Sequence, residues 1–224
     1  MPLKKKKKVL KHGTKFEKNL SISSRRYLER QVRDEYSTAA QSEGYRSRAV
    51  YKLKEIDEKY GIIKKGSVIV DLGAAPGSWS QMAVRIMERT GTVIALDKIE
   101  IDAIPGVEFL CGDFTTDECF EELQSITPSG VDVVLSDMAP ETSGNSSLDH
   151  LRIMHLAELA SDFADQHLKQ GGHFVCKLFM GGEEKAFSEM LRKKYDKVAF
   201  VKPSASRKDS REIFIVAIGF KGTE

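Results

Sequence analysis

The chain has 224 residues, of which 41% are hydrophobic and 30% charged, and its formal net charge is +2. This length suits one large α/β core, and no apolar run is long enough to span a membrane or to form an export signal, so we expect a soluble cytoplasmic protein. Three cysteines without a C-x-x-C pair argue against a zinc ribbon or a disulfide framework, and the histidines include no H-E-x-x-H motif, so no metal site is expected.

The charge is unevenly distributed along the chain. Residues 1–54 contain 16 Lys or Arg and 5 Asp or Glu, a net charge of +11, so the remainder carries −9. We expect residues 1–20 to be a flexible basic arm and residues 21–224 to be a single domain that begins with RNA-binding helices at about 21–60. The lysine run at 4–8 fits a solubilising tail or a localisation signal equally well, but the charge as a whole favours a nucleic-acid partner.

Two helices are predicted within this basic part of the chain. Residues 24–36 carry arginines at spacings compatible with a helix, and residues 45–60 place Ala49, Leu53 and Ile56 on one apolar face. Positive charge continues through the second helix, which a solubilising tail alone would not explain. The arginines expected to contact RNA, here and near the C terminus, are Arg25, Arg26, Arg30, Arg46, Arg48, Arg207 and Arg211.

The first predicted strand leads into a glycine-flanked turn. Residues 68–70 are β-branched, as in a buried parallel strand, and helical apolar spacing begins after Gly77. Ligands collect at such strand-to-helix junctions, where Gly73 and Gly77 would let them approach the backbone. The turn lacks G-x-G-x-x-G, which argues against a nicotinamide and leaves other adenosine ligands, with a tight turn that binds nothing as the alternative.

The rest of the chain alternates predicted strands and helices. We expect strands at residues 92–96, 107–110, 131–136, 173–179, 198–201 and 213–220, and helices at 148–168 and 183–195. This alternation predicts a doubly wound sheet of six or seven strands.

Acidic residues follow three consecutive predicted strands. Asp97, Asp113 and Asp137 stand at or just after the second, third and fourth strands. The carboxyl ends of parallel strands meet at one edge, so these side chains should face one crevice, with Asp97 where an acid commonly accepts hydrogen bonds from ribose hydroxyls. Asp113 alone could partly be a helix cap, but three acids beside a glycine turn favour a small-molecule site.

Lys177 interrupts an otherwise apolar predicted strand. Its neighbours are Phe174, Val175, Cys176, Leu178 and Phe179. A buried ammonium without a partner is costly, so Lys177 should either reach the open end of the sheet or be paired, and a functional role is favoured over a packing role.

Several spaced motifs together resemble one family, the FtsJ/RrmJ or RlmE-type ribosomal RNA 2′-O-methyltransferases. The resemblance runs from about Arg25 to Gly219. The motifs that carry it are DLGAAPGSWSQ at 71–81, SDMAP at 136–140, CKLF at 176–179, SR at 206–207, SRE at 210–212, RSRA at 46–49 and YKL at 51–53. Ser78 departs from the glycine usual in the family, and the polylysine start is longer than in its compact members.

The resemblance implies a Rossmann-like class I methyltransferase fold: a mostly parallel seven-stranded sheet with an antiparallel last strand, and S-adenosyl-L-methionine as methyl donor. It implies a catalytic tetrad of Lys52, Asp137, Lys177 and Glu212. The residues expected at the cofactor are Gly73, Gly77, Trp79, Asp97, Asp113 and Asp137. Since neighbouring carboxylates favour a charged lysine, we expect Lys177 to orient the hydroxyl and stabilise its negative charge rather than accept its proton.

The function implied by the resemblance is 2′-O-methylation of a uridine in 23S ribosomal RNA, within the assembled large ribosomal subunit, by a monomer. A transfer RNA or messenger RNA cap 2′-O-methyltransferase is the alternative, because those enzymes share the tetrad. A non-catalytic RNA-binding assembly factor would explain the basic arm but not Lys177 and Glu212. A small-molecule or protein methyltransferase would explain the turn but not the arm.

Overall fold

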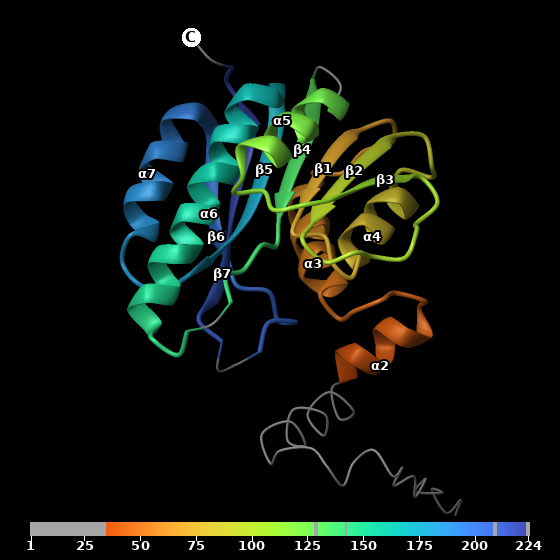
Figure 1. Ribbon diagram of the computed structural model, residues 1–224, viewed down its shortest axis with the longest axis horizontal. Helices are drawn as coiled ribbons and strands as arrows, with labels where there is room; N and C mark the ends of the chain where they lie inside the picture. Colours follow the sequence, from red (N-terminus) through yellow and green to blue (C-terminus); the bar gives the residue numbers. More distant parts are fainter. Residues whose placement is uncertain (1–34, 128–129, 142, 208–209, 223–224) are drawn as a thin grey trace, which may run out of the picture.

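The computed structural model describes residues 35–127, 130–141, 143–207 and 210–222 (Figure 1). The predicted basic arm at 1–20 and most of the helix predicted at 24–36 lie outside the described residues. Arg25, Arg26 and Arg30 lie outside them as well, so their predicted RNA contacts stay predictions.

One seven-stranded sheet forms the centre of the fold. Its strand order is β3-β2-β1-β4-β5-β7-β6, and β7 runs antiparallel to both of its neighbours. The strands are β1 (Val68–Leu72), β2 (Thr92–Asp97), β3 (Val107–Cys111), β4 (Val131–Ser136), β5 (Leu168–Phe179), β6 (Tyr195–Val201) and β7 (Glu212–Phe220). The predicted Rossmann-like sheet, mostly parallel with a reversed last strand, is confirmed.

Helices cover both faces of this sheet (Figure 1). They are α2 (Glu35–Ser42), α3 (Val50–Tyr60), α4 (Ser78–Ile86), α5 (Asp117–Ile126), α6 (Ser146–His167) and α7 (Glu184–Lys194). Buried side chains from α5, α6 and α7 pack in one cluster with the sheet, and those from α2, α3 and α4 pack in a second. None of the helices in the described ranges is long and apolar enough to cross a membrane.

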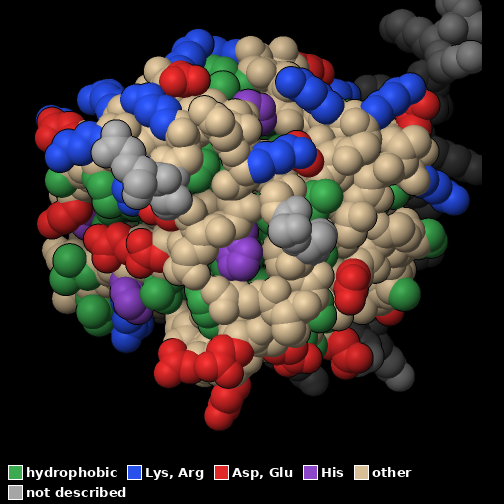
Figure 2. Space-filling view, turned by 90° about the horizontal axis from the view of Figure 1, so that it is seen from above, with side chains coloured by type: hydrophobic (Ala, Val, Ile, Leu, Met, Phe, Trp, Pro, Cys, Tyr) green, Lys and Arg blue, Asp and Glu red, His purple; other side chains and the backbone are tan. Residues whose placement is uncertain are grey.

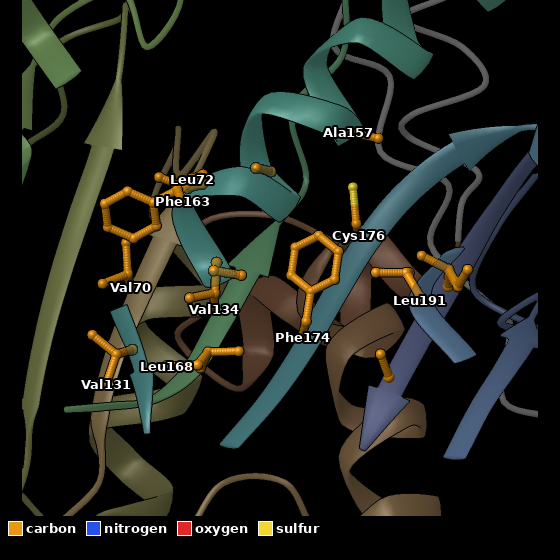
Figure 3. Packing of buried hydrophobic residues seen from close by; sticks show 14 of the residues in the cluster. Val70, Leu72, Val131, Val134, Ala157, Phe163, Leu168, Phe174, Cys176 and Leu191 are labelled. Carbon is orange, nitrogen blue, oxygen red and sulfur yellow. The ribbon is translucent and has the colours of Figure 1, made fainter. Parts of the chain in front are cut away.

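Alternation along the strands divides the core between the two faces. Val70 and Leu72 of β1 point to the α6 face of the sheet. There they pack with Val134 and Phe174 of neighbouring strands and with Phe163 of α6 (Figure 3). Ile69 points to the opposite face, toward α3 and α4. Because side chains alternate with a period of two, Asp71 also lies on the α4 face, where it is fully buried.

Some element boundaries differ from the predicted ones. Helix α3 begins at Val50 rather than at residue 45, because the segment before it makes turns whose side chains bind neighbouring loops. Strand β5 begins at Leu168, five residues before the predicted start at residue 173. Helices α2 and α5 were not predicted. The start of α5 is marked by Thr116, whose hydroxyl caps the helix by accepting a hydrogen bond from Cys119 N.

The carboxyl ends of the parallel strands lie at the end of the molecule that carries α2, at the bottom of Figure 1. Figure 2 views the opposite end, where Lys and Arg side chains are mixed with Asp and Glu. The predicted site residues therefore gather at the end that faces away from the viewer in Figure 2.

Candidate functional site

The turn after β1 is tightly bound to its neighbours. The backbone N–H groups of Gly73 and Ala74 both donate to Leu96 O, at 2.9 and 3.0 Å. Gly73 has a φ of +76°, and a Cβ built on it would lie 2.7 Å from Met138 N. The backbone of the turn thus passes against the chain that leaves β4, and only glycine fits this position.

Two of the predicted acids flank this turn with their carboxylates held by hydrogen bonds. Asp97 accepts from Ala75 N and Ile99 N, both at 2.9 Å. Asp113 lies 2.8 Å from Lys98 Nζ. The hydrogen bond from Lys98 and those from Thr115 lower the pKa of Asp113 to about 2, so the carboxylate is ionised at neutral pH.

A cavity of about 740 Å³ opens beside the turn. Gly73, Asp97, Asp113 and Asp137 line it, so the three acids face one crevice, while their contact with a cofactor stays a prediction. The exposed apolar side chain of Ile99 lines it too, so the cavity offers both carboxylate acceptors and an apolar wall. The glycine cradle, the acceptors and the volume fit a nucleoside cofactor such as S-adenosylmethionine.

Two predicted cofactor residues, Gly77 and Trp79, do not line this cavity. Trp79 is buried against Phe214, and its Nε1 donates to Ala49 O at 2.7 Å. Gly77 heads α4 with a φ of +102°, and a Cβ there would meet Ile104 at 2.6 Å. Their contact with a cofactor stays a prediction. In the structure, both contact neighbouring parts of the protein rather than the cavity.

Asp71, which sequence reasoning quoted only as part of a motif, is a fully buried carboxyl beneath the turn. Its Oδ2 accepts from Ser80 Oγ at 2.6 Å, while its Oδ1 has no hydrogen-bond partner within the described structure. Burial raises the pKa of Asp71 to about 7, against the Ser80 hydrogen bond and with help from the charges of Asp137 and Asp97. The group therefore titrates near neutrality.

Replacing Asp71 with asparagine is expected to change the pH dependence of stability. A carboxyl whose pKa is raised on folding stabilises the fold while protonated, so this stabilisation is lost as pH rises from about 4 through 7. The wild type should therefore lose up to about 4 kcal/mol of its free energy of unfolding over this range, and Asp71→Asn should not, because asparagine does not titrate. Urea denaturation of both proteins at pH 5 and pH 8 measures the difference, and a constant difference would contradict the prediction.

Lys177 is buried beside Asp137. Its Nζ lies 2.8 Å from Asp137 Oδ1 and donates a hydrogen bond to the Asp137 carbonyl oxygen at 2.6 Å. The side chains are only 8% and 17% exposed. Of the two alternatives expected for Lys177, the structure shows the buried and paired one: the chain that leaves β4 holds its ammonium.

Lys52 and Glu212 form a second pair next to the first. Lys52 Nζ on α3 donates to Glu212 Oε2 on β7 at 2.8 Å, and Ser206 Oγ donates to Glu212 Oε1 at 2.8 Å. Burial alone would raise the pKa of Glu212, but the positive charges of Lys52 and Lys177 outweigh it and lower that pKa. The structure therefore brings the four predicted tetrad residues together, with Glu212 ionised between two lysines.

Ser206 was not predicted as a site residue by itself, yet it completes the hydrogen bonding of Glu212. Ser206→Ala removes this hydrogen bond, so Glu212 is held less firmly. We expect the activation free energy to rise by about 1 kcal/mol, which corresponds to a roughly fivefold lower kcat. Ser206→Thr, which keeps the hydroxyl, should recover most of this loss. Steady-state kinetics of both variants test the effect, and equal kcat values for Ser206→Ala and the wild type would contradict it.

A groove of about 740 Å³ lies on the other side of these pairs. Lys52 and Glu212 line it together with three predicted RNA-binding residues, Arg46, Arg48 and Arg207. Burial and the neighbouring charge of Arg207 lower the pKa of the Arg48 guanidinium. Cations held this close to one another favour an anionic ligand.

The remaining predicted RNA-binding arginine, Arg211, does not line the groove. Its Nη2 donates to Ser146 O at 3.1 Å, and its carbonyl oxygen accepts from Met180 N at 3.0 Å. Arg211 thus connects the start of α6 with the loop after β5. Its predicted RNA contact stays a prediction.

Comparisons with known proteins agree with this geometry. The model of the FtsJ-like methyltransferase family matches residues 45–220. The ribosomal RNA large subunit methyltransferase E of Sinorhizobium medicae is 49% identical over 216 residues, which cover 95% of this chain and 88% of the relative. The protein of the same name from Legionella pneumophila is 48% identical, over 90% of this chain and 98% of the relative.

Solved structures share the fold. A crystal structure described as that of a ribosomal RNA methyltransferase from Plasmodium falciparum superposes with a TM-score of 0.72 at 32% identity, covering 80% of this chain and all of that one. A Clostridium thermocellum structure shares the fold alone, with a TM-score of 0.53 at 16% identity. The family match spans most of the chain, and these two relatives are 48–49% identical over at least 90% of it. The chain therefore belongs to the FtsJ-like methyltransferase family.

Proposed function

We propose that this protein transfers a methyl group from S-adenosylmethionine to the 2′-hydroxyl of a uridine in large-subunit ribosomal RNA. One observation carries the proposal: the two lysine–carboxylate pairs lie between the cavity and the groove. Asp137 lines the cavity, while Lys52 and Glu212 line the groove. A hydroxyl presented from the groove would thus meet Lys177 beside a methyl donor held in the cavity.

In the cavity, Asp97 and Asp113 would hold the nucleoside part of the cofactor and the backbone at Gly73 would lie against it. When bound, S-adenosylmethionine supplies a methyl group on a positively charged sulfur, so that transfer makes an oxygen–carbon bond, breaks a sulfur–carbon bond and leaves a neutral thioether. Asp137, which lines the cavity, would face this positive charge with its carboxylate. The apolar wall at Ile99 would exclude water from the adenosine face.

Lys177 would orient the attacking hydroxyl. A lysine ammonium has three N–H groups; one donates to the Asp137 carbonyl oxygen, and the ammonium lies 2.8 Å from Asp137 Oδ1 as an ion pair. Another N–H group would donate to the 2′-oxygen, aim its lone pair at the methyl group and stabilise the negative charge that grows as the proton leaves to water. With the carboxylates of Asp137 and Glu212 beside it, Lys177 would act as a hydrogen-bond donor rather than as a base.

Lys52 would act on the same substrate from the groove. Glu212 holds its Nζ at 2.8 Å, so the ammonium is fixed at the boundary between the groove and Lys177. There it would add positive potential near the ribose and its phosphates. Two arginines of the groove, Arg48 and Arg207, would contact the backbone of the RNA and position it without reading its sequence.

Ribosomal RNA is proposed as the substrate because relatives with nearly half of their residues identical carry that substrate in their names. The assembled large subunit, and hence the cytoplasm, is the expected place of action. A transfer RNA or messenger RNA cap 2′-O-methyltransferase is the second candidate, since a basic groove beside four such residues would serve any ribose hydroxyl.

One labelling experiment tests substrate and position together. The protein is incubated with methyl-labelled S-adenosylmethionine and, separately, large ribosomal subunits, naked ribosomal RNA, transfer RNA and ribosomal protein, and the labelled RNA is hydrolysed in alkali. A 2′-O-methyl group removes the nucleophile that cleaves the adjacent phosphodiester, so we expect label in alkali-resistant dinucleotides from large-subunit RNA. Label confined to transfer RNA would favour the second candidate, and label only in protein or in mononucleotides would contradict both.

A further inference from the structure

Arg46, which the sequence suggested as an RNA contact, directs its guanidinium at the protein itself. Its Nη1 donates to Pro76 O at 3.0 Å and to Asp102 O at 2.8 Å, and its Nη2 donates to Ala103 O at 3.2 Å. One acceptor belongs to the glycine turn after β1, and the other two belong to the loop after β2. A single side chain thus joins the turn that carries Gly73 to the loop that follows Asp97 at the end of β2.

The residues next to Arg46 extend this connection. Ser47 Oγ lies 2.8 Å from Ser78 Oγ, in hydrogen-bonding distance, and Arg46 N donates to Gln81 Oε1 at 3.0 Å. Ala49 O accepts from Trp79 Nε1 at 2.7 Å. Arg46, Ser47 and Ala49 therefore bind residues 46–49 to the turn and to the first residues of α4.

Helix α3 begins directly after this segment and carries Lys52. The position of Lys52 relative to the cavity is therefore set through residues 46–49 rather than through the sheet alone. A shift of the glycine turn would move this segment, and with it the start of α3.

We propose that Arg46 is a positioning residue that clamps the two cofactor loops to the segment leading into Lys52, and that its charge is not an RNA phosphate contact. The proposal builds on the proposed function, because it names what couples the cofactor cavity to the RNA groove. Ser78, which replaces the glycine usual in the family, adds the Ser47 hydrogen bond to this clamp.

The shape of arginine matters here as much as its charge. Three acceptors on two loops are reached by two nitrogen atoms of one planar group, and a lysine has a single nitrogen atom on a flexible stem. Arg46→Lys keeps the positive charge, so it preserves long-range attraction of RNA while breaking the clamp. This variant separates the two roles of the residue.

The test uses the full chain and two binding measurements that require no turnover. Titration calorimetry measures the affinity for S-adenosylhomocysteine, and the slope of log K against log salt concentration measures the phosphate contacts with a ribosomal RNA fragment. For Arg46→Lys we expect a roughly tenfold loss of S-adenosylhomocysteine affinity. Arg46→Gln should share that loss, and its salt slope should stay at the wild-type value because Arg46 neutralises no phosphate.

Arg207→Gln is the matched control, since Arg207 lines the same groove and has an exposed side chain. We expect it to reduce the salt slope by about 1 and to leave S-adenosylhomocysteine affinity within about twofold of the wild type. Unchanged S-adenosylhomocysteine affinity in Arg46→Lys, or a reduced salt slope in Arg46→Gln, would overturn the proposal.

Should Arg46→Lys fail to fold, Ser47→Ala decides the question, because it removes two neutral hydrogen bonds of the same segment, with Ser78 Oγ and from Ala49 N. It is expected to weaken S-adenosylhomocysteine binding about fivefold with an unchanged circular dichroism spectrum, and wild-type affinity in that variant would overturn the proposal. Failure of the proposed function would show as missing 2′-O-methyl label, which neither binding measurement depends on.

Discussion

Replacing Lys177 with alanine is expected to slow methyl transfer at least about 1,000-fold, with S-adenosylhomocysteine affinity within about twofold of the wild type. The change removes the donor that faces the attacking oxygen, and it leaves Asp137 and Glu212 as two carboxylates without the ammonium between them. An uncompensated negative charge beside a growing alkoxide adds repulsion to the loss of stabilisation. Lys177 does not line the cavity, so the cofactor keeps its other contacts.

Lys169 offers a matched control for this variant. It lies at the other end of the same strand, β5, and also forms an ion pair with an aspartate, 2.6 Å from Asp132 Oδ1, but its side chain is half exposed. Lys169→Ala should retain wild-type single-turnover rates with labelled cofactor and ribosomal subunits. Turnover of Lys177→Ala within about tenfold of the wild type would contradict the role given to this residue.

The sheet and the cavity could be predicted because short local patterns determine them. A buried parallel strand is a run of β-branched residues, and the carboxyl ends of such strands meet at one edge, so Asp97, Asp113 and Asp137 had to gather there. Lys177 could be singled out because it is a charged residue within an otherwise apolar strand. Family resemblance added Lys52 and Glu212, which lie 160 positions apart and whose pairing no local pattern reveals.

The rest depends on tertiary contacts that a linear pattern does not contain. The continuing positive charge suggested RNA contacts for Arg46, but the sequence did not indicate that three backbone carbonyl oxygens of two loops would accept hydrogen bonds from its guanidinium. Trp79 was expected at the cofactor from the family resemblance, and the structure places its ring in the core beneath helix α4. In both cases the residue lies near the predicted site, but its side chain binds neighbouring parts of the protein.

Gly73 is the position at which a single methyl group should do the most damage to cofactor binding. In Gly73→Ala, the new Cβ would lie 2.7 Å from Met138 N and 2.8 Å from Met138 Cα, and backbone atoms cannot rotate away as a flexible side chain would. The end of β4 would have to move, although Asp137 N donates to Leu72 O at 3.0 Å across this contact. We expect S-adenosylhomocysteine affinity to fall at least about 100-fold, measured by calorimetry.

The chain provides a control that separates this collision from backbone strain. Gly66, in the turn before β1, has a φ of +78° against +76° at Gly73, yet a Cβ there would meet no atom within 4 Å. Gly66→Ala should therefore cost about 1–2 kcal/mol of stability from the left-handed conformation, with normal S-adenosylhomocysteine affinity. Gly73→Ala should show the same strain and lose the ligand as well. Equal ligand affinity in the two variants would mean that the close approach of the turn to Met138 has no part in forming the cavity.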